Sequence, residues 1–176
     1  PIANFSYSDN CAGSSVLFLD LSATGGPAPA YGMASYDWDF GNSFTSTSAA
    51  PSAQTYASAG SYPVTLIVRN SRGCYDTLVQ SITIHPNPVA NFTWTQVCGN
   101  ETTVFTNSST NATSYAWDLG NSSNSSSSDP SVQYGSGGVY SVVLTSYGAL
   151  GCSDSTVQSV QVDTVPTASF LVNNAC

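Results

Sequence analysis

A set of short motifs occurs twice along this chain, and its opening motif occurs a third time. Pro-Ile-Ala-Asn-Phe at residues 1–5 returns as Pro-Val-Ala-Asn-Phe at 88–92 and as Pro-Thr-Ala-Ser-Phe at 166–170. A period this long is typical of whole domains and not of the short units that stack into solenoids. We therefore expect one repeat at 1–86, a second at 87–164, and the first strand of a truncated third repeat at 165–176.

Hydrophobic and polar residues alternate through the long segments of each copy. Val64, Leu66 and Val68 form one such row, and Val142 and Leu144 have the matching positions in the second copy. Alternation with a period of two is the pattern of a half-buried β-strand. About seven short strands in about 80 residues predict an all-β, immunoglobulin-like sandwich for each repeat. In the first copy we expect strands at residues 2–8, 15–21, 35–40, 44–47, 53–56, 61–70 and 74–85.

The composition limits the classes of partner. Hydrophobic residues make up 41% of the chain, which is enough to build a core. Arg69 and Arg72 are the only Lys or Arg residues, and the net charge is −8. Nucleic acids and anionic membrane surfaces require several basic contacts, so we expect neither as a partner. No apolar run approaches the ~18 residues of a membrane span, so we expect no membrane insertion.

The cysteines indicate an oxidising compartment. They recur at matching places in the repeats, and none belongs to a Cys-x-x-Cys pair of the kind that holds zinc. Disulfides are therefore expected, and they imply an extracellular protein. The five cysteines are Cys11, Cys74, Cys98, Cys152 and Cys176.

The combined motifs resemble those of PKD (polycystic kidney disease) domains, which are immunoglobulin-like sandwiches. In the first copy they are Trp-Asp-Phe-Gly-Asn at 38–42, Pro51, Tyr56 and the run from Gly60 to Val68. The second copy repeats them at 117–121, Pro130, Tyr134 and 138–144, but has Leu119 in place of the usual Phe. The added Gly-Cys-x-Asp-Thr/Ser element is similar to PKD arrays of Bacteroidetes, such as their gliding-motility adhesins.

The strand order implied by this resemblance bears on the disulfides. Cys11 would lie at one end of the first sandwich and Cys74 at the other, roughly 20 Å away, whereas a disulfide needs Cα atoms ~4.4–6.8 Å apart. The resemblance therefore favours a bond from Cys11 to Cys152, between repeats. Cys98 and Cys176 would then reach forward to later repeats, and Cys74 back to an earlier one. Bonds within repeats, Cys11 to Cys74 and Cys98 to Cys152, stay open as the alternative.

The aromatic residues of the motifs have two interpretations. Trp38 and Trp117 could be stacking platforms for sugars, but their place in a central strand favours a role in the structural core. Tyr62 and Tyr140 each follow a Gly turn and open a strand. They resemble a tyrosine corner, which ties a loop to the sandwich, so we expect them to be structural too.

Three carboxylates are weak candidates for calcium: Asp37, Asp39 and Asp118. Calcium prefers carboxylate and carbonyl oxygens, but it needs six or more of them. The second copy has Ala116 where the first has Asp37. The alternative is that Asp39 and Asp118 accept backbone N–H bonds in the turn that follows. We expect no metal and no cofactor.

The sequence offers few residues that could catalyse a reaction. The one histidine, His85, stands beside Pro86 in the segment between repeats, where no nucleophile–base pair can be built around it. No pair of acids recurs in both copies as a general acid and base. The sequence predicts a protein that is not an enzyme.

Three Asp-Ser/Thr-apolar triplets resemble the O-glycosylation sites of Bacteroidetes. Their hydroxyl residues are Thr77, Ser155 and Thr164, and the first two have the same position in the repeat. The alternative is that these are ordinary Ser and Thr residues of a strand and a linker.

The sequence therefore predicts a structural repeat segment of a long secreted bacterial surface adhesin or filament, located outside the cell. Its expected partners are neighbouring repeats of the same long chain, with other copies in a fibre and attached glycans as further hypotheses. The alternative is a carbohydrate- or protein-binding accessory module of a secreted hydrolase. We expect this chain to be a segment of a longer array.

Overall fold

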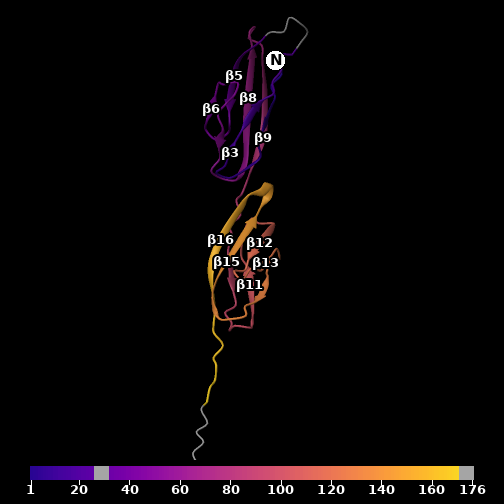
Figure 1. Cartoon of the computed structure of the whole chain (residues 1–176). Helices are drawn as coiled ribbons and strands as arrows, with labels where there is room; N and C mark the ends of the chain where they lie inside the picture. The colour runs from indigo at the N-terminus through magenta and orange to yellow at the C-terminus, as the bar shows by residue number, and fades with distance from the viewer. Residues whose placement is uncertain (26–31, 171–176) are drawn as a thin grey trace, which may run out of the picture. The chain divides into compact units, whose positions relative to one another are not determined.

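The computed structural model describes residues 1–25 and 32–170, which fold as β-strands joined by turns and loops (Figure 1). Within this part of the chain there is no α-helix, and a short 3-10 turn, η1, occupies Ala149–Gly151. Among the residues described, no helix has the length and apolar character that a membrane span requires. The chain forms two compact units: Pro1–Asn87 with Ala149–Cys152, and Pro88–Gly148 with Ser153–Cys176.

The larger sheet of the first unit has the strand order β2-β9-β8-β5-β6. Its long central strands, β8 and β9, pair antiparallel from Gly60 opposite Ile84 to Arg69 opposite Tyr75. The short β2 runs parallel to the end of β9. The bounds are Asn10–Cys11 for β2, Met33–Asp39 for β5, Thr45–Ser46 for β6, Gly60–Asn70 for β8 and Tyr75–His85 for β9.

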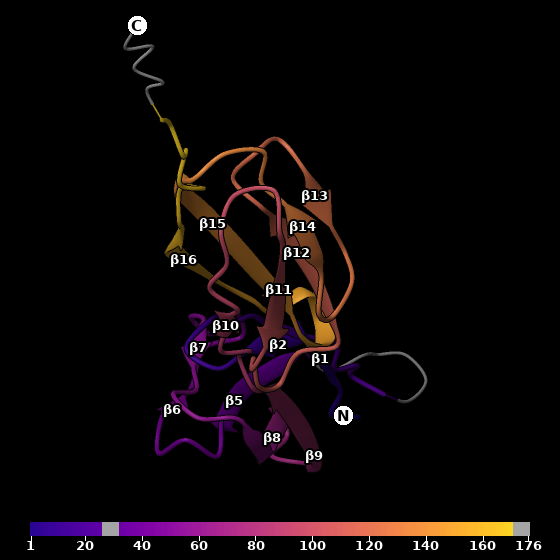
Figure 2. The same cartoon turned by 90° about the horizontal axis from the view of Figure 1, so that it is seen from below.

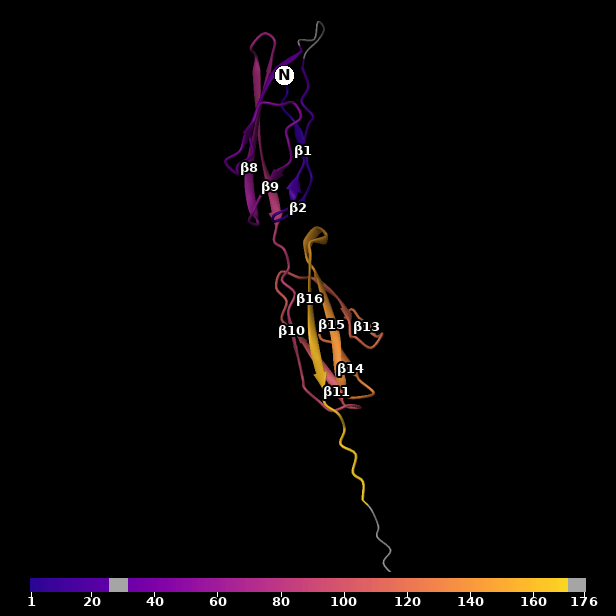
Figure 3. The ribbon, with the colours of Figure 1, turned by 60° about the vertical axis from the view of Figure 1, so that its left-hand side comes forward.

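The opposite layer of the first unit consists of two short antiparallel pairs, β1–β4 and β3–β7. Figure 3 shows β1 across from β8 and β9. The sandwich is thus formed by two layers with the core between them. The bounds are Phe5–Tyr7 for β1, Ser15–Val16 for β3, Phe18–Asp20 for β4 and Gln54–Thr55 for β7.

Alternation along the strands decides which side chains enter this core. On β8 the side chains of Val64, Leu66 and Val68 are fully buried. Trp38 of β5 packs edge-on against Phe5, with ring centroids 5.3 Å apart. Burial of each large apolar side chain stabilises the fold by about 1.5–3 kcal/mol, so these rows hold the two layers together.

The second unit repeats this arrangement. One sheet has the order β13-β12-β15-β16, and the other has the order β10-β11-β14. β15 and β16 lie side by side as the long pair (Figure 2). The bounds are Phe92–Trp94 for β10, Thr102–Asn107 for β11, Ser114–Asp118 for β12, Asn124–Ser125 for β13, Ser131–Gln133 for β14, Gly138–Tyr147 for β15 and Ser153–Val162 for β16.

The core of the second unit is again centred on a tryptophan. Trp117 packs against Phe92 and Phe105, with ring centroids 5.0 and 5.6 Å apart. Val142 and Leu144 of β15 are fully buried, as their alternation predicted. The two units therefore have equivalent cores made by equivalent strands.

The predicted strands of the first copy correspond closely to the observed ones. β2 was not predicted, because two residues that pair only at the end of a long strand carry no period of their own. The expected first strand of a third repeat, at 165–176, stays a prediction, and its described part, residues 165–170, is not in a strand here. A strand needs a neighbour to accept its backbone hydrogen bonds, and the remainder of that segment, 171–176, lies outside the described residues.

Candidate functional site

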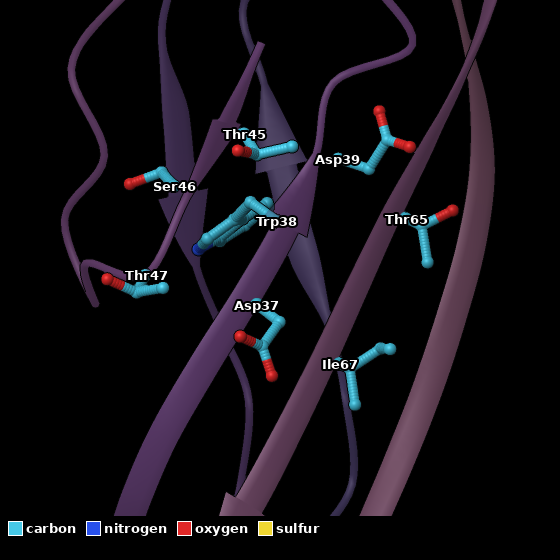
Figure 4. Close-up of a pocket in the computed structure, with 8 residues that line it drawn as sticks. All are labelled: Asp37, Trp38, Asp39, Thr45, Ser46, Thr47, Thr65 and Ile67. Atoms are coloured by element: carbon cyan, nitrogen blue, oxygen red, sulfur yellow. The ribbon is translucent and has the colours of Figure 1, made fainter. Parts of the chain in front are cut away.

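A groove of about 550 Å³ lies beside β5 and β8 of the first unit (Figure 4). Asp37 is opposite Ile67, and Asp39 is opposite Thr65, so these four residues share one side of the sheet. The groove is polar on β5 and mixed on β8. Its lining residues are Asp37, Trp38, Asp39, Thr45, Ser46, Thr47, Thr65 and Ile67.

The chemistry of this groove is not repeated in the second unit. There Ala116 is opposite Thr145, and Asp118 is opposite Val143. An alanine and a valine replace an aspartate and a threonine at equivalent positions. The side chains that line this groove therefore differ between the repeats, and they do not define what the repeats have in common.

Asp37 lies near a cation of its own unit. Its carboxylate is 3.8 Å from the Nε of Arg69, and both side chains are about half exposed. An exposed pair of this kind contributes about 0–1 kcal/mol. Within residues 1–25 and 32–170, no group of three or more His, Cys, Asp or Glu residues is placed to hold a metal ion. Calcium also takes carbonyl oxygens, so the calcium hypothesis for Asp37, Asp39 and Asp118 stays a prediction.

Asp39 and Asp118 each shape the turn that follows them. Their Oδ1 atoms accept the backbone N–H of Gly41 and Gly120, both at 2.9 Å. The two glycines have φ values of +69° and +76°. A Cβ at Gly41 would lie 2.5 Å from the carbonyl oxygen of Pro63, so this turn requires glycine.

Trp38 and Trp117 are core residues. Each is 2% exposed. Their Nε1 atoms donate to the carbonyl oxygens of Ser48 and Ser127, both at 3.0 Å. Neither ring offers an open face on which a sugar could stack.

Tyr62 and Tyr140 tie the start of a long strand to the loop before it. The Tyr62 hydroxyl donates to the carbonyl of Ser58 at 2.9 Å, and the Tyr140 hydroxyl donates to that of Ser136 at 2.8 Å. In both cases the acceptor is four residues upstream. This is the bonding pattern of a tyrosine corner.

A second pair of tyrosines is more deeply buried, and sequence reasoning gave it no role beyond its place in the motif. The hydroxyl of Tyr56 donates to the carbonyl of Phe40 at 2.8 Å, and that of Tyr134 donates to Leu119 at 2.7 Å. Burial raises the pKa of both tyrosines to about 12, and the neighbouring corner tyrosine and aspartate add to the effect. Their recurrence in both copies was the signal that could have shown this role.

Asp76 and Asp154 hold the beginning of each repeat against its long strand. The Oδ2 atom of Asp76 accepts the N–H of Ala3, and that of Asp154 accepts the N–H of Ala90, both at 2.8 Å. In the sequence these aspartates stand out only as neighbours of the glycosylation candidates Thr77 and Ser155. Their structural partner is the Ala of the opening motif, which recurs with them.

The three glycosylation candidates are exposed. Thr77 lies on β9, Ser155 on β16, and Thr164 follows β16. The Oγ atom of Ser155 is 2.9 Å from the Oγ1 of Thr145, so this hydroxyl already has a hydrogen-bond partner. Attachment of a sugar to these residues stays a prediction.

Cys11 and Cys98 have the same local structure in the two units. Cys11 pairs parallel with His85 at the end of β9, and Cys98 forms a parallel bridge with Asp163 just after β16. The backbone N–H of the following residue donates to the carbonyl oxygen of that same partner, from Ala12 to His85 at 2.9 Å and from Gly99 to Asp163 at 2.8 Å. We call these segments, residues 11–14 and 98–101, the loop-cysteine ends. The single histidine thus contributes backbone pairing there.

Cys74 and Cys152 also have equivalent positions. Each follows a glycine with positive φ, +83° at Gly73 and +79° at Gly151. Each stands directly before the first residue of a long strand, β9 or β16. We call the turns at residues 70–74 and 148–152 the turn-cysteine ends. A repeat therefore carries one cysteine at each end of its last strand.

The structure contains a disulfide between Cys11 and Cys152, with Cα atoms 5.8 Å apart. This pairing joins a loop-cysteine end to a turn-cysteine end from the other sequence repeat. The alternative pairing within repeats is absent, since Cys74 and Cys98 are free thiols. The reason is length: eleven residues of β9 separate Cys74 from the position of Cys11, and at ~3.3 Å per residue no disulfide spans that distance. Cys176 lies outside the described residues.

These features define the class of protein: a tandem pair of immunoglobulin-like β-sandwich domains. The sequence profile of the PKD domain matches residues 1–85 and again 85–164. The chain therefore belongs to the PKD domain family, which is a family of non-catalytic domains. The Leu at position 119 does not break the match.

Several proteins of Vibrio are similar to this chain. It is 52% identical over 52 residues to the pre-pro-metalloprotease PrtV of two Vibrio cholerae strains. That stretch is 30% of this chain, and the chain spans only 6% of the length of these curated relatives. The PKD1 domain of Vibrio anguillarum Epp is 35% identical, with 45% of this chain and 96% of that chain covered and a TM-score of 0.41. The PKD1 domain of Vibrio cholerae PrtV is 40% identical, with 48% of this chain and 95% of that chain covered and a TM-score of 0.40.

Proposed function

We propose that this chain is a structural repeat segment of a long secreted bacterial surface adhesin or filament, and that it extends the fibre outside the cell. The observation that supports this most is the bond between Cys11 and Cys152, because it connects one sequence repeat to the next. An independent binding module has no need of such a bond. A segment that transmits tension does.

The position of the bond determines how tension passes along the chain. Cys11 lies near the beginning of the first repeat and Cys152 near the end of the second, with a sequence separation of 141. When the ends of the chain are pulled apart, force passes through the disulfide and not through the polypeptide between the two cysteines. At about 3.4 Å per residue, roughly 480 Å of chain is shielded from extension.

Single-molecule force spectroscopy tests this proposal. The chain is held by its two ends and extended, first oxidised and then after reduction by a thiol. We expect the reduced chain to lengthen by about 480 Å more than the oxidised chain when both domains unfold. The variant Cys11→Ser should behave as the reduced chain does in both conditions. Equal extension of oxidised and reduced chains would contradict the proposal.

A second candidate is supported by the similarity to PrtV, a metalloprotease. On this proposal the two domains are an accessory module that binds a carbohydrate or a protein for a secreted hydrolase. The groove beside β5 would be its contact surface. Binding to insoluble polysaccharides and to extracellular matrix proteins tests it, with Asp37→Ala in the groove and Ala116→Asp in the second unit as matched variants. Retention that Asp37→Ala abolishes would favour this candidate over the fibre.

The partners that we propose are neighbouring repeats and other copies of the chain, together with O-glycans on Thr77, Ser155 and Thr164. The exposure of these three residues supports a modification. Intact-mass spectrometry of protein from its native source tests it. We expect added hexose masses that decrease in each of the Thr77→Ala, Ser155→Ala and Thr164→Ala variants, whereas a mass equal to the bare sequence would rule the glycans out.

A further inference from the structure

Two cysteines of the described chain are not bonded, and they are one of each kind. Cys98 belongs to a loop-cysteine end, and Cys74 belongs to a turn-cysteine end. Cys74 is exposed, and Cys98 is partly exposed. Their equivalents in the other repeat, Cys11 and Cys152, form the disulfide. The chain therefore shows directly that a loop-cysteine end and a turn-cysteine end fit together.

The backbone around Cys98 is already arranged as it is around the bonded Cys11. Asn100 donates to the carbonyl of Tyr134 at 2.7 Å, as Gly13 donates to that of Tyr56 at 2.8 Å. Hydrogen bonds also close the turn itself, from Glu101 N–H to the carbonyl of Cys98 at 3.1 Å and from Ser14 to Cys11 at 3.0 Å. Since these segments match, the free end needs no rearrangement before it accepts a partner.

Charge favours the same pairing. The free turn-cysteine end contains Arg72, two residues before Cys74, and it directly follows Arg69 of β8, which lies 3.8 Å from Asp37. The free loop-cysteine end carries Glu101 and Asp163, both exposed. Opposite charges on two surfaces accelerate their encounter and orient it. Two identical ends would instead repel each other.

We propose that Cys98 forms a disulfide with the turn cysteine of another repeat of this type, and that Cys74 forms one with the loop cysteine of another repeat. This proposal deepens the fibre proposal and rests on it. The partner is a PKD repeat with the complementary cysteine, from the same longer polypeptide or from a second copy of the chain. Either source presents the same chemistry.

The bond forms by thiol–disulfide exchange. Two thiols, one from each repeat, each lose a proton and an electron and become one S–S bond. The oxidant is a disulfide such as oxidised glutathione, which takes up both electrons and both protons and becomes two thiols. The Cys98 thiolate first attacks the oxidant to give a mixed disulfide, and the Cys74 thiolate of the partner then displaces glutathione from it.

A tandem duplication tests the first source. Residues 1–165 are joined directly to a second copy of residues 1–165, which keeps the repeat register because the motif at 166–170 matches that at 1–5. After oxidation in a glutathione buffer, disulfide mapping should find Cys98 of the first copy bonded to Cys74 of the second. Each copy should also retain its bond between Cys11 and Cys152. Free thiols at all four of the remaining cysteines, or a bond between the two Cys98 residues, would overturn the proposal for this source.

Mixing of separate chains tests the second source. All chains carry Cys176→Ser; one keeps Cys98 and has Cys74→Ser, and the other keeps Cys74 and has Cys98→Ser. Mixed dimers should form about tenfold faster than either homodimer, because only the mixed pair brings opposite charges together. A statistical mixture of the three dimers would show that separate copies do not pair specifically.

Two matched variants separate a fitted contact from chance collision of thiols. Ser71→Cys in a chain that carries both Cys74→Ser and Cys98→Ser moves the thiol within the same turn, and with the Cys98 chain it should form mixed dimers no faster than homodimers. Arg72→Glu should remove the preference for the mixed dimer, and Glu101→Arg in the partner should restore it. Unchanged rates in both variants, together with a statistical mixture and an unbonded tandem chain, would overturn the proposal entirely.

The outcomes also distinguish this proposal from the fibre proposal. A bond between Cys98 and Cys74 in the tandem chain, without any effect of reduction on its extension under force, would support the disulfide and reject the role in tension. If Cys11→Ser changed the extension under force while Cys98 stayed a free thiol in the tandem chain, the role in tension would be supported and the disulfide of Cys98 rejected.

Discussion

The two units have different side chains at equivalent core positions. Val16 of β3 is fully buried in the first unit, and its counterpart on β11 is Thr103, which is also fully buried. The Oγ1 atom of Thr103 has no hydrogen-bond partner among the residues that the structure describes. Phe40, likewise fully buried, corresponds to Leu119. The sandwich therefore tolerates one unpaired hydroxyl and one smaller side chain.

Two of the core positions that do not differ combine packing with a hydrogen bond. Trp38 and Trp117 fill the core and also donate a hydrogen bond to a loop carbonyl. Tyr56 and Tyr134 do the same through their hydroxyl groups. A substitution at a position with one duty loses only packing, whereas one at these positions also leaves a carbonyl without its donor. The comparison predicts where each unit is robust and where it is not.

The largest effect should come from the shared tryptophans. Trp38→Ala and Trp117→Ala should each lower the free energy of unfolding of their own unit by about 3–5 kcal/mol, because a large cavity forms in the core. Calorimetry and hydrogen exchange, which report on the two units separately, measure this. Leu17→Ala, at a side chain that is 64% exposed, is the control and should change stability by less than about 0.5 kcal/mol. A loss below about 1 kcal/mol for both tryptophans would refute the common core.

Alkaline pH should destabilise both units through the buried tyrosines. Burial raises the pKa of Tyr56 and Tyr134 from 10.0 to about 12 in the folded chain. Their stabilising contribution is therefore complete below pH 10.0 and is lost as the pH rises through about 12, since the unfolded chain gives up these protons first. We expect a loss on the order of 2 kcal/mol per tyrosine. Denaturant titrations at several pH values measure it.

The matched control for the pH effect is a phenylalanine at each position. Tyr56→Phe removes the titrating group of the first unit and leaves Tyr134 in the second. The alkaline loss should then vanish from the first unit alone. If both units kept the full pH dependence, other groups would have to be responsible.

An exchange of residues tests the unpaired hydroxyl directly. Thr103→Val should raise the stability of the second unit by about 1–3 kcal/mol, because it removes a buried polar group at nearly constant volume. The reverse change, Val16→Thr, should lower the stability of the first unit by a similar amount. Chemical denaturation of both variants measures the pair. A destabilising Thr103→Val would mean that the hydroxyl has a partner after all.

The smallest effect should be at the two aspartates that hold the beginning of each repeat. Asp76→Ala and Asp154→Ala each remove the acceptor of one backbone N–H, from Ala3 and Ala90. We expect a loss of about 1 kcal/mol in each unit and faster exchange of that amide. Hydrogen exchange at Ala3 and Ala90 measures it, and an unchanged rate would contradict the assigned bond.

Sequence patterns predicted the fold where a residue's role depends on its own strand. The alternation through Val64, Leu66 and Val68 predicted β8 and the side that it buries, because a strand's period appears in its own residues. The roles of Tyr56 and Asp76 depend on segments far along the chain, and no local pattern contains them. The groove beside β5 likewise arises from which residues the strand pairing brings together. The pairing of Cys11 with Cys152 is an intermediate case. It depends on a distant segment, but the strand order implied by the PKD resemblance and the length of the strands were enough to favour it.

The measurement that tests the account most directly is disulfide mapping of the oxidised chain under non-reducing conditions. Trypsin is unsuitable, because it cuts only after Arg69 and Arg72 and leaves Cys74 and Cys152 in one fragment. Digestion with pepsin at low pH separates all the cysteines and prevents exchange of disulfides. The account predicts a linked peptide that contains Cys11 and Cys152. Linked peptides that join Cys11 to Cys74 and Cys98 to Cys152 would contradict it.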